Sequence, residues 1–391
     1  MTELELVQSF RHKAKLYRVG GCVRDKLLGK KAMDIDYVLT GICLSDVDLP
    51  KVAGKDFPVF LVEIDGTICE IAMARKERKV GVGYKGFEFY CDPDVSIEDD
   101  LIRRDLTINA MAIKVGDGTL IDPYGGQKDL RDGILRHTSE AFGEDPLRVY
   151  RVARFAARFG YRIAPETRAL MLGLKGELST LTPERVGLEL TKALTCPYPD
   201  KFFRELDGML DVHFPEVEAL KVPDRHDGTA FEHTMACLYR GNGLRERFAL
   251  LVHDLGKGMS PEPPCHNGHE KHTKLVFTLG ERLRLPIRLT SFGARFMDTH
   301  MKLKKLNEMR PGKLFKLIRD RSIFKLLRLS YLESRDRYDK QLYMGHVQLA
   351  KKVLKITKAV RGQILLDRGV VPNQYFGDKL LQERIHVYKR S

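Results

Sequence analysis

Apolar residues gather in short runs within the first 140 residues of the chain. Runs rich in Leu, Val, Ile, Phe and Tyr occur at residues 16–19, 36–39, 59–62 and 67–72. Runs of this length and composition are typical of β-strands. This part of the chain is therefore predicted to be a mixed α/β head.

Beyond about Asp145 the apolar positions follow a helical period instead. Residues from Leu147 to Ala156 recur at helix spacing, and residues 165–174 repeat the pattern. Thr182 followed by Pro183 is typical of a helix start, with the threonine as the cap. Past residue 200 almost only helical segments are expected. The predicted fold class is α+β: a small head of mixed sheet and helices, followed by an all-α neck, body and tail.

The residue pattern also suggests how the chain is divided. Residues 78–94, RKVGVGYKGFEFYCDPD, are charged and interrupted by glycines, which predicts a mobile hairpin or loop. We expect four parts, namely a head at 1–140, a helical neck at 141–215, a helical body at 216–340 and a basic helical tail at 341–391.

Composition argues against membrane and secreted classes. No stretch approaches the roughly 18–20 apolar residues needed to cross a bilayer, and the first residues, MTELELVQSFRHKAK, do not resemble a signal peptide. The seven cysteines form no C-x-x-C pair, which fits reduced thiols better than disulfides or a zinc cage. A soluble cytoplasmic protein, monomeric or homodimeric, is expected.

The net charge of +14 is localised at one end of the chain. Residues 301–391 contain 23 Lys and Arg against 8 Asp and Glu, whereas the rest of the chain is close to neutral. A localised excess is a candidate surface for a polyanion. Because few aromatic residues interleave there, phosphate contact with a folded RNA is expected rather than stacking on single-stranded bases.

Candidate chemistry begins near residue 20. Gly20 and Gly21 end a predicted strand, so backbone N–H groups can approach an anion closely, and Arg24 follows as a planar donor for phosphate oxygens. Asp34 and Asp36 then open a strand, where residues i and i+2 share one face. Two hard oxygen ligands on one side suit Mg²⁺, which binds nucleotide triphosphates and activates a hydroxyl nucleophile.

This segment resembles the first motif of the class II CCA-adding enzymes and bacterial poly(A) polymerases, members of the polymerase-β-like nucleotidyltransferase superfamily. Four further family motifs follow in order, as RRD within RRDLTINAMA, DPYGG, EDPLR and TPERV. The resemblance implies a polymerase-β-like nucleotidyltransferase head that adds C, C and A to the 3′ end of tRNA without a template. The implied substrates are CTP and ATP, and the implied product is pyrophosphate.

The resemblance also implies roles for individual residues. The implied catalytic Mg²⁺ ligands are Asp34 and Asp36, with Glu70 and Glu144 in supporting positions. The implied nucleotide-binding residues are Gly21, Arg24, Arg104, Asp145, Arg148, Arg151 and Arg154.

The fourth motif carries a chemical argument of its own. A helix places Asp145, Arg148, Arg151 and Arg154 near one stripe, at spacings of three. A carboxylate accepts hydrogen bonds and a guanidinium donates them, so Asp145 and Arg148 could read a Watson–Crick edge. C and A carry an amine beside a ring-nitrogen acceptor, whereas U and G present the opposite arrangement. The alternative is a surface ladder of salt bridges.

A second constellation lies further along the chain. His253 and Asp254 end an apolar helical segment, and His233 precedes them by about twenty residues. Burying an aspartate without a cation or hydrogen bonds is costly, so the three residues are predicted to bind a metal. The segment resembles the HD-domain metal phosphohydrolases, which implies Ni²⁺ or another divalent ion. The last ligand is left open between Glu333 and Asp336. Further candidate ligands are His226, His266, His269, His272 and His300.

Together, the two constellations resemble the bacterial multifunctional CCA proteins with a fused HD domain. That resemblance implies 2′,3′-cyclic phosphodiesterase, 2′-nucleotidase and phosphatase activities beside CCA addition. The alternatives are a poly(A) polymerase, an enzyme adding only CC or only A, a stand-alone HD phosphohydrolase, and a non-catalytic RNA-binding protein.

Overall fold

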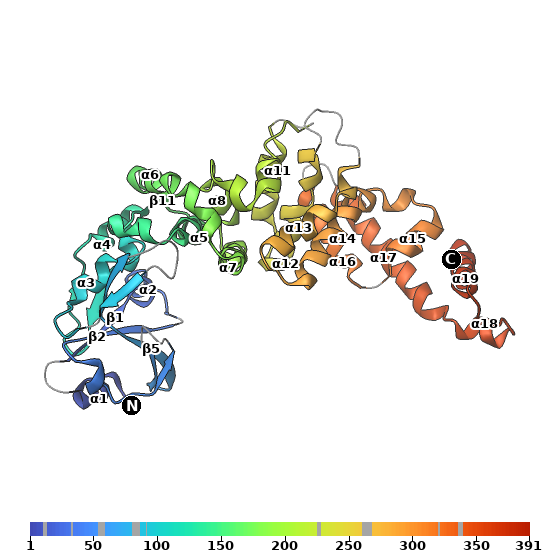
Figure 1. Cartoon of the computed structure of the whole chain (residues 1–391). Coiled ribbons are helices and arrows are strands. Elements are labelled where there is room, and N and C mark those ends of the chain that lie inside the picture. Colours follow the sequence, from blue (N-terminus) through green and yellow to red (C-terminus); the bar gives the residue numbers. More distant parts are fainter. Residues whose placement is uncertain are drawn as a thin grey trace. The chain divides into compact units, whose positions relative to one another are not determined.

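The chain clusters into two compact units, Met1–His213 and Phe214–Ser391, in the computed structural model (Figure 1). The expected division into four parts, with boundaries at residues 140, 215 and 340, is not tested by this two-unit division and stays a prediction. The structure describes residues 1–10, 14–32, 34–53, 59–79, 87–90, 92–224, 228–259, 268–319, 321–334 and 339–391.

The first unit is built on a seven-stranded mixed sheet with the strand order β3-β4-β5-β2-β1-β8-β9. Within it β2 and β5 are parallel, while β1 is antiparallel to both β2 and β8. The four strands predicted from the sequence are all present, as β1, β2, β4 and β5. The strands of this sheet are β1 (Lys15–Val19), β2 (Asp36–Thr40), β3 (Lys51–Ala53), β4 (Val59–Ile64), β5 (Thr67–Met73), β8 (Ala112–Lys114) and β9 (Leu120–Ile121).

Apolar residues cover both faces of this sheet. On one face Leu39 and Ile71 pack with Leu6 of α1 (Glu3–Ser9). On the other face Val38 packs with Leu101 of α3 (Ile97–Ile102). Neighbouring residues along a strand point to opposite faces, so burial on both sides explains why the adjacent residues Val38 and Leu39 are both apolar. The sheet is thus a rigid platform for the charged residues at its edges.

The helices that follow the sheet form a bundle within the same unit. Helix α5 (Leu147–Phe159) packs against α7 (Pro183–Thr195) and α8 (Pro199–Arg204). Thr182 is the N-cap residue of α7 as predicted, although its hydroxyl makes no capping hydrogen bond. The remaining helices of this unit are α2 (Gly21–Leu27), α4 (Gly126–Asp132), α6 (Pro165–Gly173) and α9 (Leu210–His213).

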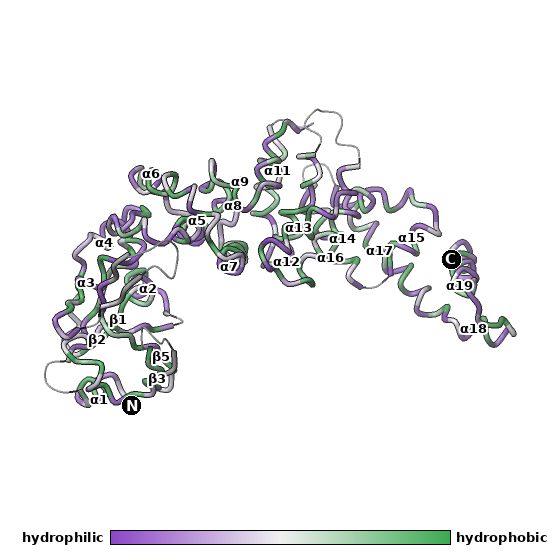
Figure 2. The backbone as a smooth tube through the Cα atoms, viewed as in Figure 1, coloured by the Kyte–Doolittle hydropathy of each residue, from purple (hydrophilic) through white to green (hydrophobic). Residues whose placement is uncertain are grey.

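The second unit is helical throughout its described residues. Apolar residues alternate with hydrophilic ones along its helices (Figure 2), and the apolar ones bury a core between α12 and its neighbours α11, α14 and α16. The helices are α10 (Pro215–Glu218), α11 (Ala230–Arg240), α12 (Gly243–Val252), α13 (Lys274–Arg282), α14 (Ile287–Leu303), α15 (Pro311–Leu317), α16 (Ile323–Glu333), α17 (Lys340–Ala359), α18 (Gln363–Asp367) and α19 (Phe376–Arg390).

The glycine-punctuated stretch contains a β-hairpin. Strand β6 (Lys76–Lys79) pairs antiparallel with β7 (Phe87–Tyr90), which confirms the hairpin alternative for these strands. The connecting residues 80–86 lie outside the described part of the chain. Among the described helices, none combines the length and apolar character needed to cross a membrane.

Candidate functional site

A cationic cleft of about 660 Å³ lies in the first unit. Its walls come from α2, the start of β2, the 3₁₀-turn Thr107–Asn109, α5 and α7. Ten Arg and Lys residues line it, against only four aspartates. Such an excess of positive charge in a concave site attracts polyanions such as a triphosphate or an RNA backbone.

The glycine pair lies at one wall of this cleft. Gly20 has φ +69°, a backbone conformation that favours glycine, and α2 begins at the next residue, Gly21. A Cβ atom at Gly20 would lie 2.9 Å from Nη1 of Arg104, so glycine leaves room for this guanidinium beside the backbone. Nη2 of Arg104 donates to Asp100 at 2.9 Å. Gly20, Gly21 and Arg104 all line the cleft, as expected for a phosphate-binding wall.

The predicted metal-binding carboxylates lie at the same cleft. Asp36 is the first residue of β2, and Asp34 lies in a bend before it, so the prediction that both stand in the strand is wrong for Asp34. Glu70 is the partner of Asp36 in the parallel pairing of β2 with β5. Partial removal from water, together with the charges of Glu70 and Asp34, raises the pKa of Asp36. Asp34 and Asp36 line the cleft and are hard-oxygen donors of the kind that suits a divalent cation, whereas Glu70 is not among the residues that line it.

A chain of polar side chains links α2 to α5 behind the cleft. Arg24 is buried and donates to Asp25 at 2.8 Å and to Asn109 at 2.5 Å. The amide of Asn109 donates to Asp105 at 3.0 Å, and Nε of Arg151 donates to the other oxygen of Asp105 at 2.8 Å. Burial alone would raise the pKa of Asp105, but the charge of Arg151 and the bond from Asn109 lower it to about 2.

The predicted base-reading residues lie at the start of α5. Asp145 precedes the helix, where one oxygen accepts from the N–H of Leu147 at 3.1 Å and the other from Arg185 at 3.0 Å. Arg148 donates to the carbonyls of Ala141 at 2.7 Å and Arg103 at 2.6 Å. Asp145, Arg148, Arg151 and Arg154 all line the cleft. These partners hold the side chains of Asp145 and Arg148 in fixed orientations at the cleft.

Several cleft residues were given no role by the sequence analysis. Asp105 and Arg185 belong to the motifs quoted above. Arg158 follows Arg151 on α5, and Lys192 follows Arg185 on α7, each two helical turns later. Helical periodicity from Arg151 and Arg185 could therefore have identified Arg158 and Lys192. Glu144, predicted to support the site, ends the 3₁₀-turn Glu140–Glu144 and is not among the residues that line the cleft.

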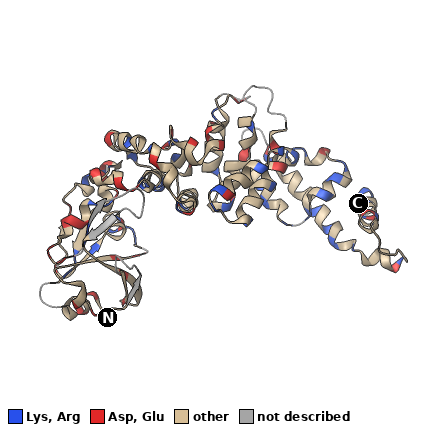
Figure 3. Cartoon of the chain, viewed as in Figure 1, with Lys and Arg blue, Asp and Glu red and all other residues tan. Residues whose placement is uncertain are grey.

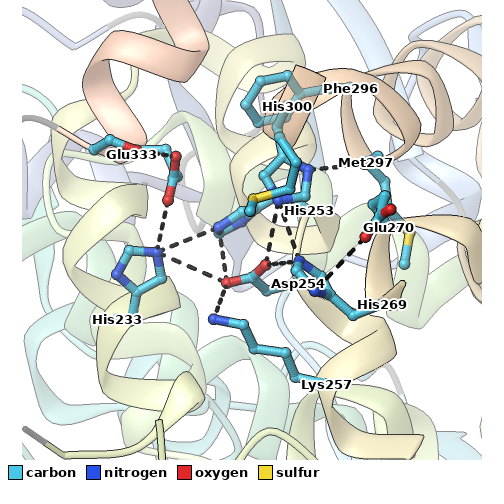
Figure 4. Close-up of polar contacts among 12 residues, drawn as sticks. His233, His253, Asp254, Lys257, His269, Glu270, Phe296, Met297, His300 and Glu333 are labelled. Carbon is cyan, nitrogen blue, oxygen red and sulfur yellow. Dashed lines mark hydrogen bonds and ion pairs between the residues drawn. The ribbon is translucent and has the colours of Figure 1, made fainter. Parts of the chain in front are cut away.

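A second cluster of titratable residues is buried in the other unit (Figure 4). His253 follows α12 directly, and the adjacent Asp254 lies at its centre. Nε2 of His253 lies 3.2 Å from Asp254 and 3.4 Å from Nε2 of His233 on α11. Glu333, at the end of α16, approaches His233 to 3.4 Å. The three predicted ligands are thus brought together, with Glu333 beside them.

Two further histidines complete the cluster. Nε2 of His269 lies 3.0 Å from Asp254, and Nε2 of His300 on α14 lies 3.6 Å from it. Of the other candidates, His272 is exposed outside the cluster, while His226, His266 and Asp336 lie outside the described residues. A Cβ atom at Gly256 would lie 2.2 Å from the carbonyl oxygen of His269. Glycine is therefore needed at 256 for the segment carrying His269 to approach.

Hydrogen bonds fix the orientation of the buried rings. Nδ1 of His253 lies 2.7 Å from the carbonyl of Leu250, and Nδ1 of His300 lies 2.7 Å from that of Met297. A carbonyl only accepts, so Nδ1 carries a proton in both rings, and this bond turns Nε2 of each ring toward Asp254. Burial lowers the pKa of His300 to about 3.

The carboxylates of the cluster remain ionised. Although burial alone would raise the pKa of Asp254, the charges of His253 and Lys257 hold it well below its usual range. Nζ of Lys257 lies 2.8 Å from Asp254, and Nζ of Lys304 lies 2.7 Å from Glu333. Imidazole nitrogens and carboxylate oxygens form a donor set that suits a divalent transition metal.

Comparison with known proteins identifies relatives over nearly the whole chain. Residues 16–136 match the model of the poly A polymerase head domain, and residues 160–221 match that of a probable RNA- and SrmB-binding site of polymerase A. The multifunctional CCA protein of Pseudomonas syringae pv. syringae is 40% identical, covering 96% of this chain and 98% of that protein. That of Nitrosococcus oceani is 47% identical over 78% of this chain and 79% of that protein.

Solved structures with a similar fold are also known. The chain resembles the Bacillus stearothermophilus CCA-adding enzyme in complex with CTP, with a TM-score of 0.71 at 22% identity, covering 97% of this chain and 90% of that one. A second CCA-adding enzyme structure with CTP gives a TM-score of 0.65 at 26% identity, covering 95% and 87%. These likenesses confirm the predicted fold class.

The like-charged carboxylates predict a gain in stability when one charge is removed. Because the pKa of Asp36 is raised in the folded state, its ionised form destabilises the fold at neutral pH. This destabilisation decreases as pH falls through the raised pKa and is gone below the ordinary pKa of an aspartate. Asp36→Asn should therefore raise the unfolding temperature in chelator by about 2 °C at pH 7, and by less in acid. Added Mg²⁺ should stabilise the unmodified protein more than the variant.

Differential scanning calorimetry provides the measurement. Asp46→Asn, at an exposed residue away from the cleft, is the matched control and should leave the unfolding temperature unchanged. An unfolding temperature that falls in Asp36→Asn, or an equal Mg²⁺ response in both proteins, would contradict the assignment.

Proposed function

Because the chain belongs to the family of the multifunctional CCA proteins, we propose that its cleft adds C, C and A to the 3′ end of tRNA without a template. ATP and CTP are the nucleotide substrates, and pyrophosphate leaves. The observation that carries this proposal is the cleft itself, in which ten cations surround the carboxylates of Asp34 and Asp36. A triphosphate needs the cations, and a divalent ion needs the carboxylates.

Asp34 and Asp36 are proposed to hold Mg²⁺, supported by Glu70 across the β2–β5 pair. Bound there, Mg²⁺ would lower the pKa of the RNA 3′-hydroxyl and neutralise charge on the triphosphate. The protein positions the reacting groups: β2 carries Asp36, the bend before it carries Asp34, and the Gly20–Gly21 turn with Arg104 would bind phosphate. Proper placement of hydroxyl and phosphate accounts for much of the acceleration in phosphoryl transfer.

Base selection is proposed to fall to Asp145 and Arg148. Arg185 holds one oxygen of Asp145, and two carbonyls hold Arg148, so neither side chain can turn to follow a different base. A guanidinium presents five N–H donors in one plane, and donation from Arg148 would suit the ring nitrogen of C or A. The carboxylate accepts from the exocyclic amine. U and G would present carbonyl oxygen to Asp145 and an N–H to Arg148, and both pairings are repulsive.

Sequencing of RNA 3′ ends tests the proposed transfer. Purified protein with Mg²⁺, ATP and CTP should extend a tRNA lacking its CCA end by CCA and then stop. Asp34→Ala should reduce the rate at least 10²-fold, because a metal ligand is lost, whereas Asp46→Ala should not. A growing A tract would identify a poly(A) polymerase, and addition of only CC or only A a partial enzyme.

A second activity is proposed for the buried histidine cluster, as a metal-dependent phosphohydrolase acting on 2′,3′-cyclic and 2′-phosphate ends and on other phosphomonoesters. His233, His253 and Asp254 are the proposed ligands, with Glu333 as the further acidic residue. The supporting observation is that Nδ1 of His253 is bonded to the carbonyl of Leu250, while its Nε2 lies 3.2 Å from Asp254 in a buried site. Ni²⁺ or another divalent ion would supply an activated water for attack on phosphorus.

Hydrolysis of 2′,3′-cyclic AMP and 2′-AMP tests this activity. With Ni²⁺ the protein should hydrolyse both, and His253→Gln should lower kcat/KM at least tenfold through loss of a ligand. His272→Gln, at the exposed histidine outside the cluster, is the control and should retain the rate. Equal loss in the two variants, or hydrolysis that survives complete chelation, would refute the assignment.

The basic C-terminal region is proposed to contact tRNA phosphates. Lys and Arg recur along the helices from α15 to the C-terminus (Figure 3). On α17, Lys351, Lys355 and Lys358 are exposed at helical spacing, as expected for a row of phosphate contacts. Each contact with a phosphate releases a counterion, so binding through such a surface weakens as salt rises.

Filter binding of tRNA at 50–200 mM KCl tests this contact. Affinity should fall at least tenfold over that range, and replacing Lys351, Lys355 and Lys358 with Gln should weaken binding and flatten the salt dependence. The control replaces three lysines of the first unit, Lys15, Lys114 and Lys128, with the same change in charge. A flat dependence in the unmodified protein, or equal effects of both triple variants, would count against this surface.

A further inference from the structure

A pocket of about 610 Å³ lies in the second unit, and neither proposed activity uses it. Its size falls within the range of about 300–1,000 Å³ that is usual for small-molecule sites. None of the described residues that line it belongs to the histidine cluster, and on α14 Ile287 and His300 are about 20 Å apart along the helix axis. Apolar side chains form much of its lining, namely Leu244, Pro286, Ile287, Leu289 and Phe292.

Three arginines line the same pocket, Arg245, Arg288 and Arg295, and no acidic residue is among its described lining residues. Nη1 of Arg295 donates to Oγ of Ser322 at 2.6 Å, which holds it at the start of α16. In the described part of the chain no carboxylate pairs with Arg245 or Arg288. Positive charge beside apolar surface, without a neutralising carboxylate, favours a ligand that has both an anionic group and an apolar body.

Three helices begin at this pocket, which adds to its positive potential. Leu244 is in the first turn of α12, Ile287 is the first residue of α14, and Ser322 is the N-cap residue of α16. The N-terminal end of a helix carries a partial positive charge. The first turns of α14 and α16 contain no acidic residue that would cancel this charge. The helix ends therefore reinforce the preference of the arginines for an anion.

A stacking surface for an aromatic ring lies beside these cations. Cζ of Arg245 lies 4.0 Å from the ring centre of buried Phe292, so a cation–π contact holds this guanidinium at the pocket. A guanidinium plane is also a surface on which nucleobases stack. Ile287 is 67% exposed and offers an apolar contact in the same pocket. A planar base against Arg245 and Ile287 would cover apolar surface that otherwise faces water.

We propose that this pocket binds a free nucleoside monophosphate, with the base against Arg245 and Ile287 and the phosphate at Arg288 and Arg295. A phosphate monoester carries about 1.5 to 2 negative charges at pH 7, which suits several arginines better than the single charge of a carboxylate does. The proposal rests on neither of the two proposed activities. A ligand that binds only the folded protein stabilises it, so this site would couple the stability of the second unit to the nucleotide concentration.

Photo-crosslinking tests the site directly. The full chain is titrated with 8-azidoadenosine 5′-monophosphate in EDTA, which withholds metal from both proposed activities, and the adducts are mapped by mass spectrometry. Adducts are expected within residues 243–247 or 286–295, and only these are scored. AMP should compete for them. Adenosine, which lacks the phosphate, and ribose 5-phosphate, which lacks the base, should each compete about tenfold less well.

Variants at the pocket supply a matched comparison. Arg288→Gln should weaken competition by AMP about tenfold, because a charged hydrogen bond to the phosphate is lost. Ile287→Glu, at an exposed residue outside the core, should abolish these adducts by repelling the phosphate. The control Arg310→Gln, at an exposed arginine outside the pocket, should leave them unchanged.

The outcomes that overturn the proposal are distinct. Absence of these adducts, equal effects of Arg288→Gln and Arg310→Gln, or competition by adenosine equal to that of AMP would each refute a nucleotide site. Displacement of the probe by decanoate but not by AMP would assign the pocket to an amphipathic carboxylate instead. Displacement by tRNA but not by AMP would assign it to RNA. Either result would overturn the free nucleotide as the ligand.

Discussion

The cleft of the first unit depends on one buried carboxylate, that of Asp105. One oxygen of Asp105 accepts a hydrogen bond from the amide of Asn109, and the other accepts one from Arg151. The side-chain oxygen of Asn109 in turn accepts a hydrogen bond from Arg24. Removing one partner from a buried ion pair typically costs about 3–5 kcal/mol, because the remaining charge is left uncompensated. The wall that carries Arg24 and the helix that carries Arg151 are therefore held in one arrangement. Neither can shift without breaking a bond to Asp105 or Asn109.

The same physical rule organises the second unit around a different aspartate. Asp254 is fully enclosed, yet four imidazoles and Lys257 surround it. A charge in such a place is tolerated only with several compensating partners. In the first unit those partners are arginines and an amide, which make a permanent support. In the second they are mostly imidazole rings, whose nitrogens are also suited to bind a cation.

The sequence predicts the local parts of this molecule well. The four strands and the start of α7 were expected because each depends on neighbouring residues, and the predicted cleft residues from Gly21 to Arg154 lie in short ordered motifs. What it could not supply are contacts between distant segments. The pairing of Arg185 with Asp145 joins residues 40 positions apart. Likewise, the sequence does not rank the five further histidine candidates, and it is the packing of α14 and the close approach at Gly256 that bring His300 and His269 to Asp254. Strand and turn boundaries, as at Asp34, also depend on packing.

The ligands of the second unit are widely spread along the chain. His233 is on α11, His300 on α14 and Glu333 at the end of α16, so the cluster gathers segments separated by up to 100 residues. An ion bound there would close several long loops at once, and the entropy lost by the unfolded chain grows with the length of each loop. The ion would thus serve as a removable cross-link. Resistance of this unit to cellular proteases would then follow the supply of the metal, apart from any chemistry the site performs.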